Sequence, residues 1–256
     1  MNPTKTTQPK IQKLLNVDNN AKTVKGQKYG VLTAVMYLAP ADLSGFNVCS
    51  MAVLAGCKEP CLNTAGHGVF NSVQAARVRR TRFFFEDRQG FMLQLVKEIE
   101  ALIKKATKLN LKPAVRLNGT SDIKWENVRF DYEFAFGKVR SVTIFQLFPE
   151  VQFYDYTKIP NRKPPSNYHL TFSYSDRAEF KKYNEQAVRK GLNIAVVFES
   201  PEMVQDKMRN GFMGLRVVDG DESDVRFTDD SGVVVALYAK GKAKKDTSGF
   251  VVRSGE

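Results

Sequence analysis

The sequence predicts a single-domain α/β protein, folded as a complete or degenerate (β/α) barrel of the TIM type. Short apolar segments recur along the chain, and most of them end in a cluster of polar residues. Helical segments fit between several of these apolar segments, as they do where helices alternate with the strands of a parallel sheet. The sequence contains no glycine-rich dinucleotide-binding motif, so a barrel is favoured over a doubly wound sheet.

Length and composition support one folded domain. The chain has 256 residues, of which 43% are hydrophobic and 26% charged, as in ordinary globular proteins. We expect a flexible tail over residues 1–25 and a single domain over 26–256. The chain starts with polar residues, and no apolar run approaches the roughly 18 residues of a membrane helix, so we expect a cytoplasmic protein without a membrane partner.

The first strand is expected at 29–38, whose apolar and β-branched residues are typical of a buried strand. A loop at 42–68 follows and contains every cysteine of the chain. Loops of this length in compact domains are usually functional. We expect this loop at the mouth of the barrel formed by the carboxyl ends of the strands.

Residues 70–110 have the apolar spacing of helices, with Phe91, Leu95 and Ile99 recurring at four-residue steps. A break at Gly90 predicts two helices. Periodicity alone leaves open a short strand at 82–85, which would be the eighth strand of the barrel.

Six further strands are expected after Pro113, at 114–117, 151–154, 169–172, 193–198, 215–218 and 233–238, with a helix at 177–190. Parallel sheets and barrels bind their ligands at the carboxyl ends of the strands. The polar residues near these ends are therefore candidate ligand-binding residues: Arg116, Asn118, Asp122, Asp155, Lys158, Asp219, Asp221 and Lys240. Turns, caps and ion pairs among the same side chains are the alternative explanation.

The cysteines form one cluster in the sequence. Cys49, Cys57 and Cys61 are separated by seven and three residues, and no other cysteine occurs. An odd number of thiols in a reducing cytoplasm argues against a structural disulfide. Thiolates favour zinc and iron–sulfur clusters, and one loop can bring several of them to one centre. Three buried cysteines that bind nothing are the plainest alternative.

Two cofactors suit three thiolates in one loop. A [4Fe-4S] cluster held by them would leave one iron open for a ligand or substrate. A structural zinc site needs four ligands, and His67 is the histidine close enough in sequence to complete it. We favour the cluster and keep zinc as the alternative cofactor.

The net charge of +12 favours contact with anions, either a small anionic ligand or nucleic acid. Basic residues concentrate at 77–88 and 240–245, although a basic surface also serves solubility. Two function classes remain: a redox protein or enzyme whose cluster is open to a small ligand, and a zinc-stabilised nucleic-acid-binding protein. The sequence has no P-loop, and its two histidines suggest no nucleophile–base pair, which argues against P-loop ATP hydrolysis and Ser–His hydrolysis.

Five segments carry a family resemblance: CSMAVLAGCKEPCLNTAGHG (Cys49–Gly68), RLNGTSD (Arg116–Asp122), FYDYTK (Phe153–Lys158), VDGDESDVRF (Val218–Phe227) and AKGKAKKDTSGFV (Ala239–Val251). Together they resemble the phage-encoded "gene product 88" family over nearly the whole chain after the tail. The resemblance implies a bacteriophage protein, which would act in the cytoplasm of the infected bacterial host.

A weaker similarity links the cysteine loop after a first strand to radical S-adenosylmethionine enzymes. That similarity would imply S-adenosylmethionine as a second cofactor. Those enzymes usually carry a C-x3-C-x2-C loop, and the spacing here is wider and differently ordered. The departure counts against S-adenosylmethionine as a ligand of this protein.

Overall fold

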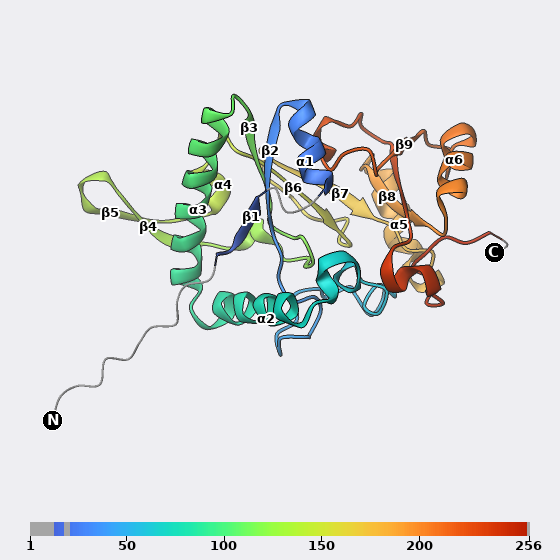
Figure 1. Cartoon of the computed structure of the whole chain (residues 1–256), viewed down its shortest axis with the longest axis horizontal. Helices are drawn as coiled ribbons and strands as arrows, with labels where there is room; N and C mark the ends of the chain where they lie inside the picture. The colour runs from blue at the N-terminus through green and yellow to red at the C-terminus, as the bar shows by residue number, and fades with distance from the viewer. Residues whose placement is uncertain (1–12, 18–20, 255–256) are drawn as a thin grey trace.

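A mixed sheet of eight strands runs through the computed structural model, which describes residues 13–17 and 21–254 (Figure 1). Its strands are β1 (Leu15–Val17), β2 (Val31–Met36), β3 (Lys112–Arg116), β6 (Gln152–Thr157), β7 (Tyr168–Ser173), β8 (Ile194–Phe198), β9 (Val217–Asp219) and β10 (Val234–Tyr238). Their order across the sheet is β1-β2-β3-β6-β7-β8-β10-β9. Among the described residues, β1 is the one strand of this sheet that is antiparallel to its neighbour. The predicted α/β class is confirmed.

The sheet is open over the residues that the structure describes. The prediction of a complete barrel is therefore wrong. Closure would require β2 to pair with β10, but the outer edge of β2 pairs with β1 and the outer edge of β10 pairs with β9. Between these edges, the six parallel strands β2, β3, β6, β7, β8 and β10 follow one another in chain order. That order is what a degenerate barrel would need, and a degenerate barrel stays a prediction.

The α-helices within the described ranges are α1 (Ala21–Lys25), α2 (Asn71–Glu86), α3 (Arg88–Lys108), α4 (Ile144–Leu147), α5 (Lys181–Arg189) and α6 (Pro201–Asn210). The α2 and α3 helices connect β2 to β3, α5 connects β7 to β8, and α6 connects β8 to β9. The helix expected at 177–190 begins later because Arg177 is extended and residues 178–180 form a 3-10 turn.

Residues 70–110 form two helices, as predicted, but the break lies at Asp87 rather than at Gly90. The backbone of Asp87 leaves the helical region, with φ −139° and ψ 71°, and its carboxylate accepts a hydrogen bond from the Gly90 N–H at 2.9 Å. Gly90 therefore belongs to the capped first turn of α3. The short strand considered at 82–85 is wrong because this segment is the last part of α2.

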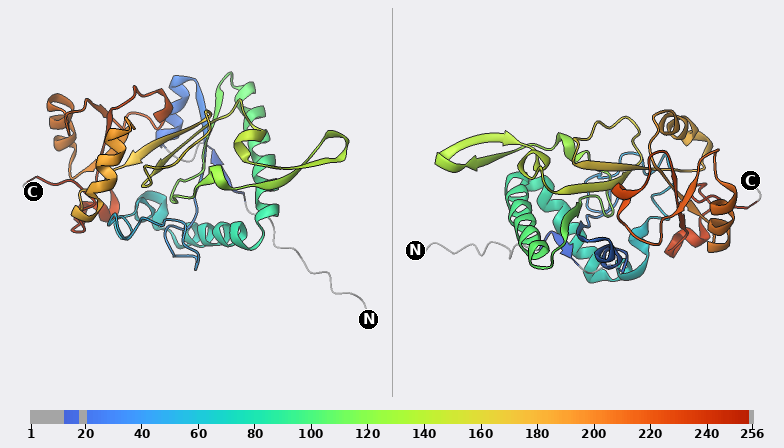
Figure 2. Two further views of the ribbon diagram at one scale, coloured as in Figure 1. Left: turned by 180° about the vertical axis from the view of Figure 1, so that it is seen from behind. Right: turned by 90° about the horizontal axis from the view of Figure 1, so that it is seen from above.

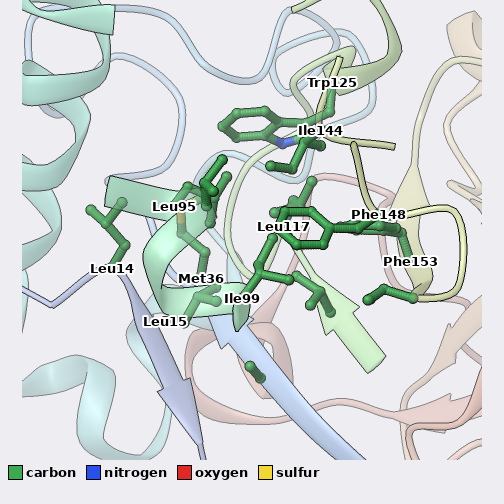
Figure 3. Packing of buried hydrophobic residues seen from close by; sticks show 14 of the residues in the cluster. Leu14, Leu15, Met36, Leu95, Ile99, Leu117, Trp125, Ile144, Phe148 and Phe153 are labelled. Carbon is green, nitrogen blue, oxygen red and sulfur yellow. The ribbon is translucent and has the colours of Figure 1, made fainter. Parts of the chain in front are cut away.

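Two apolar clusters cover one face of the sheet. The larger packs α3 against β1, β2, β3 and β6 and contains Leu95, Ile99, Trp125 and Phe153 (Figure 3). The smaller packs α5 and α6 against β7, β8, β9 and β10. The strand register places the contributing residues of neighbouring strands side by side on this same face. Residues of the opposite alternation, such as Arg116 and Tyr156, therefore face the other side of the sheet.

Part of the expected tail is built into the fold. Leu14 and Leu15 are buried in the larger cluster, and β1 extends the sheet beside β2. The Glu98 carboxylate of α3 accepts backbone N–H groups of Leu14 at 2.8 Å and of Leu15 at 2.7 Å. Side-chain burial and these bonds order residues 13–17. The rest of the predicted tail before them, residues 1–12, lies outside the described residues.

A two-stranded hairpin was not predicted. Strands β4 (Phe130–Phe134) and β5 (Lys138–Val142) pair antiparallel in a sheet of their own. The hairpin extends away from the eight-stranded sheet, as both views of Figure 2 show. Apolar and charged residues alternate through Phe130, Asp131, Tyr132 and Glu133, which is the period of a strand.

No helix of the described residues has both the length and the apolar composition to cross a bilayer.

Candidate functional site

A cavity of about 860 Å³ lies at the carboxyl ends of the parallel strands, and Cys49, Cys57 and Cys61 all line it. The wall includes Tyr37 after β2, residues 118–122 after β3, Lys158 after β6, and Tyr238 and Lys240 at the end of β10. One side of α2 completes it. The volume lies within the range of small-molecule sites, about 300–1,000 Å³. The cysteine loop thus lies at the edge of the sheet where the sequence placed it.

The cysteine loop is fixed by segments that are distant in the sequence. The Ser175 hydroxyl donates to the Ala55 carbonyl at 2.7 Å, and the Ser248 hydroxyl donates to the Gly56 carbonyl at 2.8 Å. Near the start of the loop, the Asp122 N–H donates to the Val48 carbonyl at 2.8 Å. These bonds hold the backbone directly before Cys49 and Cys57.

Gly56 has a conformation that only glycine adopts without strain. Its φ is +66°, and a Cβ at this position would lie 2.7 Å from both Arg177 Cδ and Ser248 Oγ. The residue that follows it in the chain is Cys57. The orientation of the second cysteine therefore depends on a left-handed, closely packed glycine.

The thiols are close enough to influence one another's ionisation. Burial raises the pKa of Cys49 to about 12, and charge on Cys61 and Cys57 adds to that effect. Burial also raises the pKa of Cys61 to about 11, again with a contribution from Cys57. Thiols in this setting are protonated at neutral pH, whereas a bound metal keeps coordinating thiols deprotonated. A cationic centre would relieve the repulsion between them.

Lys158 lies on the cavity wall beside Cys57. Its Nζ donates to the Tyr174 carbonyl at 2.7 Å and lies 4.4 Å from the centre of the Phe250 ring. Burial lowers the pKa of Lys158 to about 8, and charge on Cys57 opposes that shift. The lysine thus carries a positive charge next to a potential thiolate.

Arg116 also lines the cavity, and it points from the face of the sheet opposite the helices. Its Nη1 pairs with Oδ2 of Asp224 at 3.1 Å, and its guanidinium carbon lies 4.7 Å from the centre of the Tyr156 ring. The Tyr154 hydroxyl donates to the same Asp224 oxygen at 3.0 Å. The predicted anion-binding arginine is therefore already anchored by one carboxylate.

Asn118 lines the cavity, but its side-chain oxygen holds the turn after β3 together. Asn118 Oδ1 accepts hydrogen bonds from the Ser121 hydroxyl at 2.8 Å, the Ile123 N–H at 3.0 Å and the Trp125 indole N–H at 3.0 Å. The predicted ligand-binding residue is thus the centre of a structural turn.

Asp155 lies beneath this turn and outside the cavity lining. Its two oxygens accept the Asn118 N–H at 2.7 Å and the Tyr168 hydroxyl at 2.7 Å. Strand β6 continues to Thr157, so Asp155 is a strand residue that faces the helix-covered side and not a residue of the following loop. Burial raises its pKa to about 7.

Asp122 reaches the cavity and is held by three donors. The Thr157 hydroxyl and the Lys158 N–H each donate to it at 2.8 Å, and Arg162 pairs with it at 3.3 Å. Burial raises its pKa, and the charge of Arg162 opposes the shift. Asp122 is the predicted carboxylate that the structure brings to the cysteines.

The remaining predicted residues differ in whether they line the cavity. Lys240 lines the cavity, and its Nζ pairs with Asp221 Oδ1 at 2.6 Å. Asp219 Oδ1 accepts the Asp221 N–H at 2.7 Å within the turn after β9. Neither aspartate belongs to the cavity lining.

Sequence reasoning missed Tyr37, Arg77 and Arg80, all of which line the cavity. The two arginines lie within the basic segment 77–88 of α2. Residues three apart on a helix share a face, so the spacing of Arg77 and Arg80 signalled a basic stripe once this segment was assigned as helix.

His67, the residue considered as a fourth zinc ligand, also lines the cavity. Within the described part of the chain, no group of three or more histidines, cysteines, aspartates or glutamates is arranged to hold a metal ion in the structure as it stands.

Comparison with known protein families gives a match over nearly the whole chain. Residues 12–254 match the family described as gene product 88. Neither the curated proteins nor the solved structures contain a match to this chain. The similarity to radical S-adenosylmethionine enzymes therefore finds no support in these comparisons.

Proposed function

The chain belongs to the gene product 88 family, and we propose that its cavity binds a [4Fe-4S] cluster through Cys49, Cys57 and Cys61, with one iron left open to a small anionic ligand. The observation that carries this proposal is that three thiols spread over thirteen residues of one loop line a single cavity at the carboxyl edge of the sheet. We also infer that the protein is encoded by a bacteriophage and acts in the cytoplasm of the infected host.

The donor set fits a cluster in its chemistry. Thiolate sulfur is the usual protein ligand of iron–sulfur clusters. A single tetrahedral zinc needs every sulfur within about 2.3 Å of one point, whereas a cubane cluster takes one thiolate on each of three irons, so its sulfurs lie farther apart. When bound, such a cluster supplies electron transfer and an iron that accepts a further ligand.

The charges around the thiols also fit. Three thiolates give a [4Fe-4S] cluster in its usual oxidised state a net negative charge. Lys158 lies near Cys57 and Arg77 lies near Cys61, so that each cation lowers the pKa of its thiol against the effect of burial. These side chains would stabilise the bound thiolates, and their positive charges would offset the negative charge of the cluster.

Anaerobic purification tests the proposal. We expect a brown protein with broad visible absorption, about four irons and four acid-labile sulfides per chain, and loss of both in Cys49→Ala, Cys57→Ala and Cys61→Ala. Ser50→Ala changes an exposed neighbour of Cys49 and should keep the full iron content. A colourless anaerobic preparation with one zinc per chain would reject the cluster.

The hairpin favours a second candidate function, binding of single-stranded nucleic acid. In this alternative the cysteine loop is a structural zinc site with His67 as fourth ligand. Tyr132 lies opposite Arg140 and Phe134 opposite Lys138, so that aromatic and basic side chains share one face of the hairpin. Stacking surfaces beside cations are what single-stranded nucleic acids bind.

Salt dependence tests this second function. We expect a labelled single-stranded oligonucleotide to bind at low salt and to lose affinity steeply as salt rises, because phosphate contacts release counterions. The double substitution Lys138→Ala and Arg140→Ala should weaken binding, whereas Arg189→Ala, an exposed arginine of α5, should not. Absence of binding at low salt would reject this function.

A further inference from the structure

Two arginines of the cavity wall each keep one edge of the guanidinium group without a partner among the residues that the structure describes. Arg77 comes from α2 and Arg116 from the end of β3, and they are 7% and 9% exposed. Arg77 donates through Nη1 to Asn63 Oδ1, and Arg116 donates through Nη1 to Asp224. In each arginine the anchoring bond uses Nη1, so the opposite edge of the guanidinium group takes no part in it.

That opposite edge consists of Nε and Nη2. The Nε of both arginines is buried and has no hydrogen-bond partner, and no bond of either Nη2 occurs among the residues that the structure describes. A buried donor without a partner is costly, and its presence needs an explanation. The Nε–Nη2 edge is a pair of parallel donors that matches the two oxygens of a carboxylate or phosphate.

Tyr37 connects the two arginines. The guanidinium carbon of Arg77 lies 5.0 Å from the centre of the Tyr37 ring. Burial lowers the pKa of Arg77, and Tyr37 opposes that shift. Burial also disfavours the charged form of Arg116, but the nearby Asp224, with smaller contributions from tyrosines that include Tyr37, outweighs it and raises the pKa. All three side chains line the cavity, with the Arg77 guanidinium against the Tyr37 ring and the Arg116 guanidinium against the Tyr156 ring.

The charges of the wall leave a positive excess at this place. The carboxylates among the lining residues are Asp122 and Asp224, and they are already paired with Arg162 and Arg116. In the described part of the chain, no ion pair between Arg77 and a carboxylate is present. An anion entering the cavity would meet two fixed guanidinium groups and no competing free carboxylate.

We propose that the Nε–Nη2 edges of Arg77 and Arg116 bind the carboxylate or phosphate group of the small molecule that occupies this cavity. The inference deepens the proposed function and rests on it, because it names the chemical class of the ligand that would lie beside the open iron. Arg77 lies near Cys61, which places the anionic group at the Cys61 side of the cluster site. The aromatic rings of Tyr37 and Tyr156 behind the guanidinium groups keep both planes fixed.

Calorimetric titration of the anaerobically purified protein with inorganic phosphate and with malonate tests the inference, and the two probes distinguish a phosphate ligand from a carboxylate ligand. We expect at least one probe to bind, and Arg77→Gln to weaken that binding about tenfold to 100-fold, the usual worth of a charged hydrogen-bonding group. Arg77→Lys keeps the charge but loses the pair of parallel donors, so its affinity for the probe should lie between those of the unmodified protein and Arg77→Gln.

Arg116→Lys is the second variant, since it keeps a cation opposite the buried Asp224 and so preserves folding. It should also weaken binding of the probe. Arg79→Gln, an exposed arginine of the same helix, is the matched control and should bind as the unmodified protein does. Iron content is measured on every sample.

The outcomes separate the two proposals. Full iron content with no binding of either probe, or with binding unchanged in Arg77→Gln and Arg116→Lys, overturns the anion site and leaves the cluster standing. Arginine-dependent binding in a protein without iron supports the anion site and rejects the cluster.

Discussion

The indole N–H of Trp125 donates to Asn118 Oδ1 at 3.0 Å, which ties the buried tryptophan of the core to the turn that lines the cavity. The same oxygen accepts two further hydrogen bonds from within the turn. The position of the cavity wall after β3 is thus set from beneath by the packing of the core.

Asn118→Ala should lower the free energy of unfolding by about 2–4 kcal/mol, because it leaves several buried donors without an acceptor. Urea unfolding followed by Trp125 fluorescence measures the change. Asn127→Ala, an exposed asparagine close by, should change stability by less than about 0.5 kcal/mol. Equal effects of the two substitutions would show that the hydrogen bonds of Asn118 do not add to the free energy of unfolding.

The raised pKa of Asp155 predicts that the folded protein loses stability as the pH rises. Its pKa in the folded protein is about 7, above the ordinary value of 3.8, because burial disfavours the charged form. The folded state therefore holds a proton that the unfolded state has released. This contribution is complete below about pH 4 and is lost as the pH rises through 7, at up to about 1.4 kcal/mol per pH unit.

Asp155→Asn removes that titration. Urea unfolding from pH 4 to pH 8 gives the unfolding free energy of both proteins. As the pH rises, the unmodified protein should lose stability relative to the Asp155→Asn variant. A difference that stays constant over this range would contradict the assigned pKa.

Gly56→Ala should disturb the cysteine loop more than an ordinary left-handed glycine would. Strain at positive φ costs about 1–2 kcal/mol at any such position. Gly191 has nearly the same φ, +67° against +66°, but a Cβ there meets nothing within 4 Å. We expect Gly191→Ala to lower stability by the strain alone, and Gly56→Ala to lower it further and to reduce the iron bound per chain. Normal iron content in Gly56→Ala would show that the position of Cys57 tolerates the change.

Leu15→Ala tests whether β1 is part of the core. Leu15 is 1% exposed, so its truncation should lower the free energy of unfolding by about 2–5 kcal/mol. Val24→Ala, at a valine that is 43% exposed, should cost less than about 0.5 kcal/mol. Thermal unfolding of the two variants gives the comparison. Unchanged stability in Leu15→Ala would show that β1 is not part of the core and belongs to the predicted tail.

The sequence was sufficient to predict most parallel strands, because their apolar runs are short and bounded by turns. It was insufficient for the closure of the sheet. Strand β1 is three residues long and has no apolar periodicity, yet by pairing with β2 it occupies an edge that a barrel would need. Edge pairing is decided by tertiary contacts such as those of Glu98 with the backbone of Leu14 and Leu15.

The sequence could not show which side chains face the cavity where a strand is buried on both faces. Asp155 and Tyr156 are neighbours in β6, and only Tyr156 belongs to the cavity lining. Composition does not reveal which alternation faces a ligand when both sides of a strand are covered. Arg77 was overlooked for a different reason, since the candidate residues were taken from the carboxyl ends of strands, whereas Arg77 lies on the α2 helix.

The bonds that hold the cysteine loop have a consequence for the time at which the site forms. Ala55 is bonded to Ser175 across 120 residues, and Gly56 to Ser248 across 192. Contacts of such long separation form late, and the bond to Gly56 can form only after residue 248 has been synthesised. The cavity therefore takes its final shape only after β10 and the segment that follows it have been added, and until then the nascent chain leaves its three thiols exposed.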